Sequence, residues 1–547
     1  MDEPIYYVCK YTPIELLSGF GLRAERLDPA PVSFECADGC AHPNLCGYGK
    51  AILEETLGRG IRRLLLVDCC DVCRRVYDVL LARGGMDFLL LLSLPHQNGP
   101  AERALLAGEL RRLQAALERL TGDNVDRQEV SRAWRKAAKA QEQVEGGPYI
   151  ALTGAHGGAL LLCLLCQRAA LPVRDLTCTG IRTLPGPEEE TADFLTAYAA
   201  ALLGQERPCM RMQFRPPTET AGAVGVVCHT VKFCDYYGFE YRALKARKEP
   251  LLKIETDCTP QSGGQLRTRI EAFMEMLGEG ERKMDPKSDR GQYVAGVDSG
   301  SSSTDAVILN RRGEIVGSAI LPTGAGAAAG AEKALEAALR NAGLTADQLG
   351  AVVTTGYGRE AIGGQRSVTE ITCHAKGAHH LAPEARTVID IGGQDSKVIR
   401  LDENGQVINF VMNDKCAAGT GRFLEMMART MELSLDEMSE LGLRWQRDMQ
   451  ISSMCTVFAE SEVVSLIAAN TASSDIVHGL NESVAAKTVS LVRRAGGEPA
   501  YVMTGGVARN RGVVQAIEKK LSAAVRVPEE AQLCGALGAA LIALEGI

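Results

Sequence analysis

The chain has 547 residues, a formal net charge of −8, 46% hydrophobic residues and 23% charged residues. This composition is ordinary for a globular protein, and the length allows more than one domain. The negative net charge gives no global basic field that would attract nucleic acid or an anionic membrane. The N-terminal segment lacks the features of a signal peptide, and the longest apolar runs are too short to span a membrane. We therefore expect a cytoplasmic protein with neither nucleic acid nor membrane as a partner.

The cysteines are distributed unevenly, because fourteen of the eighteen precede Pro286. In a reducing compartment this density favours metal binding over disulfides. Three groups stand out in the N-terminal half: Cys36, Cys40 and Cys46 before a helix, Cys69, Cys70 and Cys73 at a strand-to-helix turn, and Cys234. Four others have the apolar surroundings of small core residues: Cys163, Cys166, Cys178 and Cys228. Structural zinc is the main alternative to iron–sulfur ligation.

Residues 1–280 alternate between strand-like and helix-like segments. Short apolar runs predict strands at 62–68, 88–94, 224–228 and 251–256, and periodic segments predict helices at 71–83, 102–120 and 265–277. This alternation predicts parallel α/β structure, with ligands at the carboxyl ends of the strands. Cys69 and Cys70 follow one predicted strand and Cys234 follows another, so we expect a buried metal cluster at such a crevice.

A charged segment at 281–292 without apolar periodicity predicts a linker between domains 1–280 and 293–547. Beyond it, YVAGVDSGSSSTDAVILN predicts a strand, a Gly/Ser-rich turn and a second strand. TVIDIGGQDSKVIRLDENGQVINFVM repeats this design, and YVMTGGVARN adds a strand that ends in two glycines. The sequence therefore predicts an internal duplication.

The turns of the duplicated hairpins predict a nucleotide clamp. Backbone N–H groups and hydroxyls at such turns wrap phosphates, and acidic side chains hold Mg²⁺. We expect Asp298, Asp390 and Gln394 to be catalytic, with Gln394 positioning water or metal. The remaining predicted contacts to Mg-ATP are Gly300, Ser301, Ser302, Gly356, Gly392, Gly393, Asp395, Gly505 and Gly506.

Two cysteines of the C-terminal half, Cys416 and Cys455, each precede a predicted helix. A helix N-terminus favours a thiolate. Two thiols are too few for an iron–sulfur cluster or a zinc site within one chain, but two chains at a two-fold axis would supply four. The pattern therefore predicts a homodimer that shares a cluster, and two buried core thiols are the alternative.

DSGSSSTD, DIGGQDSK and MTGGVARN resemble the acetate kinase/sugar kinase/Hsp70/actin superfamily. NDKCAAGTGRFLE and MCTVFAESE narrow the resemblance of residues 293–547 to the BadF/BcrA-type ATPases that activate 2-hydroxyacyl-CoA dehydratases. This resemblance implies a duplicated actin-like fold and a homodimer bridging one 4Fe–4S cluster through Cys416 and Cys455. It also implies ATP hydrolysis that drives one-electron transfer from a donor such as ferredoxin or flavodoxin.

YTPIELLSGFGL, CDVCRRVYD, VKFCD and ETDCTPQSGGQLRTRIEAFMEML make residues 1–280 similar to the dehydratase D-component family, which includes the double-cubane cluster proteins. The resemblance implies a further iron–sulfur cluster, with Cys46, Cys70 and Cys234 at the matching positions. The additional Cys36, Cys40, Cys73 and Cys209 leave the nuclearity of this cluster open. Whether another dehydratase subunit is needed is also open, because only one such domain is present.

Together these patterns predict an ATP-dependent, low-potential electron-transfer protein fused to its own iron–sulfur acceptor, which acts on a 2-hydroxyacyl-CoA or another small molecule. One alternative is a sugar-kinase-like phosphotransferase, which would leave Cys416 and Cys455 without a role. The other is an iron–sulfur sensor or scaffold in which nucleotide only sets the conformation.

Overall fold

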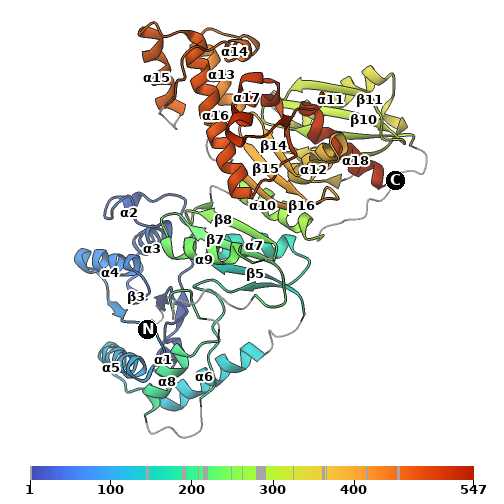
Figure 1. The fold of residues 1–547 in the computed structure, drawn as a ribbon. Coiled ribbons are helices and arrows are strands. Elements are labelled where there is room, and N and C mark those ends of the chain that lie inside the picture. Colours follow the sequence, from blue (N-terminus) through green and yellow to red (C-terminus); the bar gives the residue numbers. More distant parts are fainter. Residues whose placement is uncertain are drawn as a thin grey trace. The chain divides into compact units, whose positions relative to one another are not determined.

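The computed structural model contains two compact units, Met1–Gly280 and Glu281–Ile547 (Figure 1). The structure describes residues 3–142, 147–187, 193–206, 208–212, 220–247, 249–260, 263–278, 291–324, 326–359, 362, 364, 366–413, 417–451 and 456–546. Most of the predicted linker, residues 281–290, lies outside these ranges. Across the described ranges, no helix is long and apolar enough to cross a membrane.

The N-terminal unit contains two four-stranded sheets with the strand orders β2-β1-β3-β4 and β6-β5-β7-β8. Every strand pair in them is parallel, which confirms the predicted α/β class. The second sheet repeats the topology of the first. The strands are β1 (Ile5–Tyr7), β2 (Ala24–Arg26), β3 (Arg63–Val67), β4 (Phe88–Leu92), β5 (Tyr149–Gly154), β6 (Val173–Asp175), β7 (Ala223–Val231) and β8 (Leu251–Thr256).

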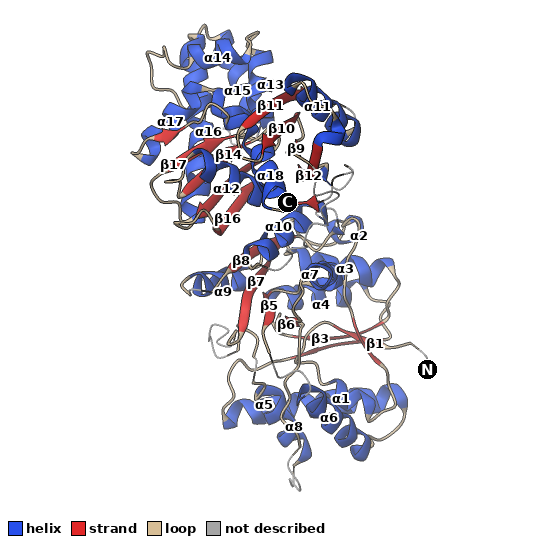
Figure 2. Ribbon diagram, turned by 90° about the vertical axis from the view of Figure 1, so that its right-hand side faces the viewer, coloured by secondary structure: helices blue, strands red, loops and turns tan. Residues whose placement is uncertain are grey.

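Helices cover both faces of these sheets, which explains why the strands are apolar throughout. In β3, Leu64 and Leu66 pack against α2, α3 and α4, whereas Leu65 and Val67 pack on the side of α1, α5, α6 and α8 (Figure 2). The helices are α1 (Ile14–Ser18), α2 (Glu35–Asp38), α3 (Gly47–Gly58), α4 (Asp71–Arg83), α5 (Pro100–Thr121), α6 (Arg127–Glu142), α7 (Gly158–Arg168), α8 (Phe194–Leu203), α9 (Asp235–Lys245) and α10 (Gly263–Met276).

The C-terminal unit contains two five-stranded sheets, β11-β10-β9-β12-β13 and β16-β15-β14-β17-β18. In each sheet the first three strands are antiparallel and the last two pairings are parallel, which confirms the predicted duplication and the actin-like fold. The strands are β9 (Tyr293–Ser299), β10 (Ser303–Asn310), β11 (Ile315–Pro322), β12 (Leu349–Gly356), β13 (Arg366–Ser367), β14 (Thr387–Ile391), β15 (Ser396–Leu401), β16 (Val407–Asn413), β17 (Tyr501–Thr504) and β18 (Val525–Arg526).

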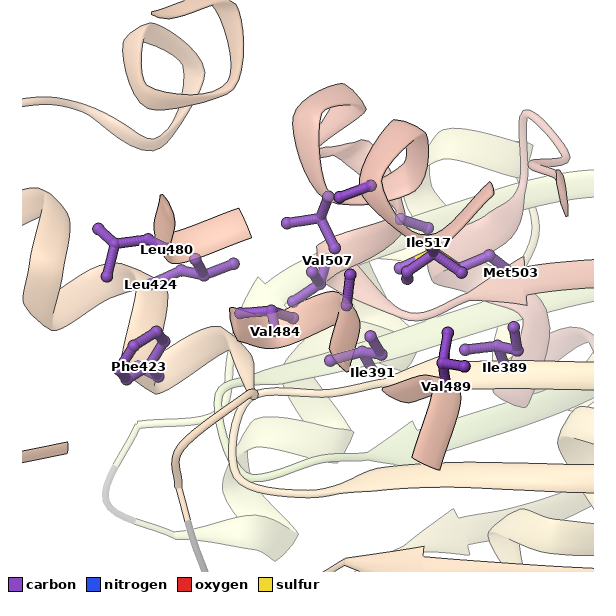
Figure 3. Close-up of a cluster of buried hydrophobic side chains, with 14 of the residues drawn as sticks. Ile389, Ile391, Phe423, Leu424, Leu480, Val484, Val489, Met503, Val507 and Ile517 are labelled. Carbon is purple, nitrogen blue, oxygen red and sulfur yellow. The ribbon is translucent and has the colours of Figure 1, made fainter. Parts of the chain in front are cut away.

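The largest apolar cluster of this unit lies between the second sheet and the helices that follow it (Figure 3). Leu480 and Val484 of α16 lie one helical turn apart, with Leu480 beside Leu424 of α13 and Val484 near Ile391 of β14 (Figure 3). The helices are α11 (Ala327–Ala342), α12 (Glu370–Leu381), α13 (Gly421–Thr430), α14 (Leu435–Leu441), α15 (Thr456–Ala468), α16 (Ser473–Ala495), α17 (Arg511–Leu521) and α18 (Cys534–Glu545), with 3₁₀ turns η2 (Ala346–Gln348), η4 (Gly506–Arg509) and η5 (Ala531–Leu533).

Replacing Leu480 with alanine should destabilise the C-terminal unit by about 2–5 kcal/mol, because Leu480 is fully buried and the change leaves a cavity. Ile408→Ala is the control, since Ile408 is 47% exposed, and it should cost less than about 1 kcal/mol. Urea unfolding in a Trp134→Phe background measures this difference, because the remaining tryptophan, Trp445, stacks on His478 of α16. Equal midpoints for the two variants would contradict the packing shown in Figure 3.

Candidate functional site

The turns that follow β9, β14 and β17 line a cavity of about 520 Å³ in the C-terminal unit, a size within the range of small-ligand sites. The antiparallel hairpins β9–β10 and β14–β15 place a glycine-containing turn on either side of it, as the duplication predicted. Ten of the predicted nucleotide-site residues lie in its wall: Asp298, Gly300, Ser301, Ser302, Asp390, Gly392, Gly393, Asp395, Gly505 and Gly506.

Each half of the duplication pairs one aspartate with one glycine in the same way. Asp298 on β9 faces Gly356 at the end of β12, and Asp390 on β14 faces Gly505 after β17. Both glycines have positive φ, 86° and 82°. A Cβ atom at Gly356 would lie 2.5 Å from Asp298 Oδ1, and one at Gly505 would lie 2.6 Å from Asp390 Oδ1. Glycine is therefore required at both positions, because any side chain would displace the carboxylate.

Lys397 on β15 is a buried cation surrounded by carboxylates. Its Nζ lies 2.8 Å from Asp395, 3.2 Å from Asp390 and 3.4 Å from Glu370. Burial opposes the charge of Lys397, but these three carboxylates raise its pKa well above the usual value. Burial raises the pKa of Glu370 to about 7, although Lys397 opposes this shift. The ammonium of Lys397 thus holds Asp390 and Asp395 in place on either side of the turn at Gly392 and Gly393.

His374 on α12 lies between the aspartates of the two sheets. Its Nε2 is 3.7 Å from Asp298 Oδ2, its Nδ1 is 3.5 Å from Asp390 Oδ1, and Nδ1 is also 3.2 Å from Thr504 Oγ1. Burial disfavours the imidazolium, yet the nearby Asp390 raises the pKa of His374 well above its usual value. Burial beside Asp298 also raises the pKa of Asp305 to about 8. The cleft therefore contains carboxylates whose pKa values differ, with Asp305 raised and Asp390 lowered.

Two predicted residues are placed differently from the rest. Gln394 is exposed and is absent from the lining of the cavity. Gly356 packs against Asp298 and does not itself line the cavity. Sequence reasoning missed Lys397 and Glu370 and gave His374 no role. The strand alternation of DIGGQDSK could have placed Lys397 on the same side as Asp395, but only the packing of α12 brings Glu370 and His374 to the cleft.

A second cavity lies in the N-terminal unit, where the carboxyl ends of its two sheets meet. Eight cysteines from both sheets line it: Cys9, Cys46, Cys69, Cys70, Cys73, Cys178, Cys209 and Cys234. We call it the thiol-lined cavity. The Sγ atoms of Cys69 and Cys70 lie 3.4 Å and 3.6 Å from Sγ of Cys73, and the three thiols form a potential metal-binding group.

The three cysteines predicted as ligands occupy equivalent local positions. Cys46, Cys70 and Cys234 are the N-cap residues of α3, α4 and α9, each with an extended backbone. A helix N-terminus stabilises a thiolate. Burial nevertheless raises the pKa of Cys46 to about 12, with the backbone N–H of Gly49 opposing it. A bound metal would therefore have to displace the proton from this thiol.

The charge of this cavity also suits an anionic metal cluster. Arg211 lines it and is 7% exposed, and its guanidinium lies 4.4 Å from the ring centroid of Tyr236. Within the described part of the chain, its Nε and Nη1 have no hydrogen-bond partner. Burial opposes the charge, but the thiols of Cys69 and Cys70 raise the pKa of Arg211 above its usual range. Converging thiols beside a buried guanidinium fit an iron–sulfur cluster.

The other cysteine predictions have mixed outcomes. Cys73 and Cys209 line the thiol-lined cavity, whereas Cys36 and Cys40 do not, and Cys36 is exposed. Cys178 is only partly buried and lines the cavity. The expectation of core positions was wrong for Cys163 and Cys166, which are exposed because they lie on the outward side of α7, and correct for Cys228. Cys416 and Cys455, the predicted ligands of the shared cluster, lie outside the described residues.

Family models match both halves of the chain. The model described as the BadF/BadG/BcrA/BcrD ATPase family matches residues 295–543. The model described as 2-hydroxyglutaryl-CoA dehydratase, D-component, matches residues 9–146 and 141–277.

Curated relatives match the C-terminal half. An activator of lactoyl-CoA dehydratase from Anaerotignum propionicum is 48% identical over 254 residues, which are 46% of this chain and 98% of the relative. A 2-hydroxyisocaproyl-CoA dehydratase activator from Clostridioides difficile is 46% identical over 46% of this chain and 95% of its own length. The solved structure of component A of Acidaminococcus fermentans (R)-2-hydroxyglutaryl-CoA dehydratase has 43% identity, a TM-score of 0.45, and coverage of 46% of this chain and 98% of that chain.

Gly505→Ala should weaken binding of a non-hydrolysable ATP analogue at least about tenfold, or about 1.4 kcal/mol, because the new Cβ would displace Asp390. Gly356→Ala should have a similar effect through Asp298. The control is Gly313→Ala in the turn after β10, where φ is also positive (77°) and the nearest atom is 3.8 Å away. Isothermal titration calorimetry with Mg²⁺ checks this, and affinity equal to that of the control would show that the glycines are not needed at the site.

Proposed function

Because the chain belongs to the BadF/BadG/BcrA/BcrD ATPase family in its C-terminal half and carries a 2-hydroxyglutaryl-CoA dehydratase D-component domain in its N-terminal half, we propose that it is an ATP-driven electron-transfer protein fused to its own acceptor. The functional domains are 1–280 and 293–547, joined by the linker 281–292. The observation that carries the proposal is the presence in one chain of a carboxylate-lined cleft and an eight-cysteine cavity.

The C-terminal cleft binds and hydrolyses Mg-ATP in this proposal. Asp298 and Asp390 hold Mg²⁺, directly or through its water ligands, as hard oxygen donors from the two sheets. The turns at Gly300–Ser302 and Gly392–Asp395 donate N–H groups and hydroxyls to the phosphates. Gln394, which is exposed and does not line the cavity, is proposed to turn toward the attacking water when nucleotide binds. Lys397 fixes Asp390 and Asp395 so that the oxygen ligands are positioned before the metal binds.

We further propose that two copies of the chain share one cluster through Cys416 and Cys455 of each copy. Cys455 directly precedes α15, whose apolar face is solvent-exposed, with Val457 and Phe458 each 66% exposed. Exposed apolar side chains gathered on one helix are typical of a protein interface, and a second copy would cover them next to the cysteine. A 4Fe–4S cluster in such a site supplies one-electron transfer at a potential set by its environment.

The thiol-lined cavity is proposed to hold the accepting iron–sulfur cluster. Cys46, Cys70 and Cys234 are the proposed ligands from the resemblance, and Cys73 and Cys209 are next to them in the same wall. Cys9, Cys69 and Cys178 raise the number of available thiols to eight, which is enough for a cluster larger than a single cubane. The substrate is a 2-hydroxyacyl-CoA or another small molecule, and the external donor is a ferredoxin- or flavodoxin-type protein.

Cys416→Ala should abolish the shared cluster while leaving nucleotide binding within about twofold of the unaltered protein, because the aspartates and glycine turns proposed to bind Mg-ATP are unchanged. Iron and sulfide quantification with EPR after anaerobic purification measures the loss. Cys373→Ala is the matched control, since Cys373 is a fully buried thiol of the same unit. An unchanged C-terminal cluster signal in Cys416→Ala would refute the shared-cluster assignment.

The experiment that tests the whole function is reduction of the protein by a strong donor, followed by EPR. With ATP and Mg²⁺ the N-terminal cluster signal should appear. It should fail to appear with a non-hydrolysable analogue, in Cys70→Ala, and in Asp298→Asn or Asp390→Asn, which should lower turnover of ATP at least about tenfold because they weaken the Mg²⁺ site. An N-terminal cluster reduced equally well without nucleotide would refute the coupling and favour the sensor alternative.

A further inference from the structure

The two duplicated hairpins of the C-terminal unit carry different side chains at one equivalent position. Asp298 on β9 lies directly opposite Asp305 on β10. In the same register of the second hairpin, Asp390 on β14 lies directly opposite Lys397 on β15. All four residues line the C-terminal cleft. Directly opposed side chains share one face of a sheet, with Cβ atoms about 4.5–5.5 Å apart. The second hairpin thus pairs a carboxylate with an ammonium, whereas the first pairs two carboxyl groups.

The second hairpin contains a cation of its own. The ammonium of Lys397 lies 3.2 Å from Asp390 and 2.8 Å from Asp395. It also lies 3.4 Å from Glu370 of α12. A buried carboxylate requires such a partner, because burial removes the water that would otherwise stabilise its charge. The carboxylates of this hairpin are therefore compensated within the protein.

Among the described residues, the first hairpin has no equivalent cation. Asp305 is 6% exposed, and its Oδ2 accepts a hydrogen bond from the Ser303 hydroxyl at 3.4 Å. The buried Oδ1 of Asp305 has no hydrogen-bond partner in the described part of the chain. His374 lies 3.7 Å from Asp298, but the same imidazole lies 3.5 Å from Asp390. Two adjacent carboxyl groups thus share one basic neighbour with the other hairpin, and like charges directly opposite each other are unfavourable.

Resting on the proposed function, we propose that Asp298 and Asp305 bind a divalent cation between them before nucleotide arrives. This cation has the role in the first hairpin that the Lys397 ammonium has in the second. Mg²⁺ prefers carboxylate oxygens and keeps several water ligands, so one or two carboxylates suffice until phosphates are added. The assignment makes Asp305 a metal ligand, and Asp390, which is paired with Lys397, contacts the metal through water.

Other carboxylates of the cleft are less suited to bind this cation. Glu370 and Asp395 already lie within 3.4 Å and 2.8 Å of the Lys397 ammonium. Asp436 of α14 also lines the cleft, but it is exposed. Water solvates an exposed carboxylate, so its interaction with another charge is weak. Asp436 is therefore the matched control, because it is the same residue type in the wall of the same cleft.

The first test is binding of Mn²⁺ alone to the full-length protein, measured from the room-temperature EPR signal of free Mn²⁺. Carboxylate and water ligands suit Mn²⁺ as they suit Mg²⁺. Asp305→Asn keeps the shape of the side chain and removes its charge, so it should weaken Mn²⁺ binding at least about tenfold. Asp436→Asn should change the Mn²⁺ affinity by less than about twofold.

The second test gives the first hairpin the charges of the second. In the unaltered protein, replacing Mg²⁺ with EDTA should weaken binding of a non-hydrolysable ATP analogue at least about tenfold, because the phosphates then face two carboxylates without a cation. Asp305→Lys supplies an ammonium opposite Asp298, so affinities with Mg²⁺ and with EDTA should differ by less than about threefold. Isothermal titration calorimetry measures both affinities.

Equal Mn²⁺ affinity in Asp305→Asn and the unaltered protein would overturn the proposal, and so would an equal loss in Asp436→Asn. Retention of the full Mg²⁺ dependence in Asp305→Lys would also overturn it. Thermal melting followed by circular dichroism shows whether each variant is folded. If Asp305→Asn does not fold, Asp298→Asn decides the question, since unchanged Mn²⁺ affinity in that variant would equally overturn the proposal.

The outcomes also separate this inference from the proposed function. A protein that binds the ATP analogue with Mg²⁺ but lacks a Mn²⁺ site dependent on Asp305 would refute the metal assignment alone. A protein that binds neither Mn²⁺ nor the analogue would refute the proposed ATPase itself.

Discussion

The C-terminal unit depends on the pairing of buried carboxylates in its cleft with buried cations. The two sheets meet through their carboxylates, and two buried cations, Lys397 and His374, lie among them. A buried carboxylate without a partner would cost several kcal/mol. The buried carboxylates differ in their pKa values. The nearby His374 and Lys397 lower the pKa of Asp390, whereas burial raises the pKa values of Asp305 and Glu370. The result is a set of carboxylates held in fixed positions around the cleft.

Duplication produces the sites of both units by the same physical route. An open sheet leaves backbone groups and loop side chains free at the carboxyl ends of its strands. When a second copy of the same sheet faces the first, the loops of both enclose one cavity. In the C-terminal unit these loops carry aspartates and glycines, and in the N-terminal unit they carry cysteines at helix N-termini. The two architectures differ, but each positions one reactive centre between two similar halves.

The thiol-lined cavity gathers side chains from the ends of several strands of the N-terminal unit. Eight cysteines line it, and the thiols of Cys69 and Cys70 raise the pKa of the buried Arg211 beside them. A positive charge among converging thiols is the electrostatic environment that favours thiolates.

The sequence by itself determined the α/β class, the duplicated hairpins, the aspartates and glycines of the cleft, and the positions of Cys46, Cys70 and Cys234 just before helices. These features are local, because strand periodicity, glycine turns and helix starts depend on neighbouring residues. Only the tertiary structure brought His374 of α12 between Asp298 and Asp390, and added Cys9, Cys69 and Cys178 to the other thiols. It alone also placed Asp28 2.8 Å from His156, although the two residues are separated by more than a hundred positions along the chain. Such contacts depend on how sheets and helices pack, and no short-range pattern of residues encodes that packing.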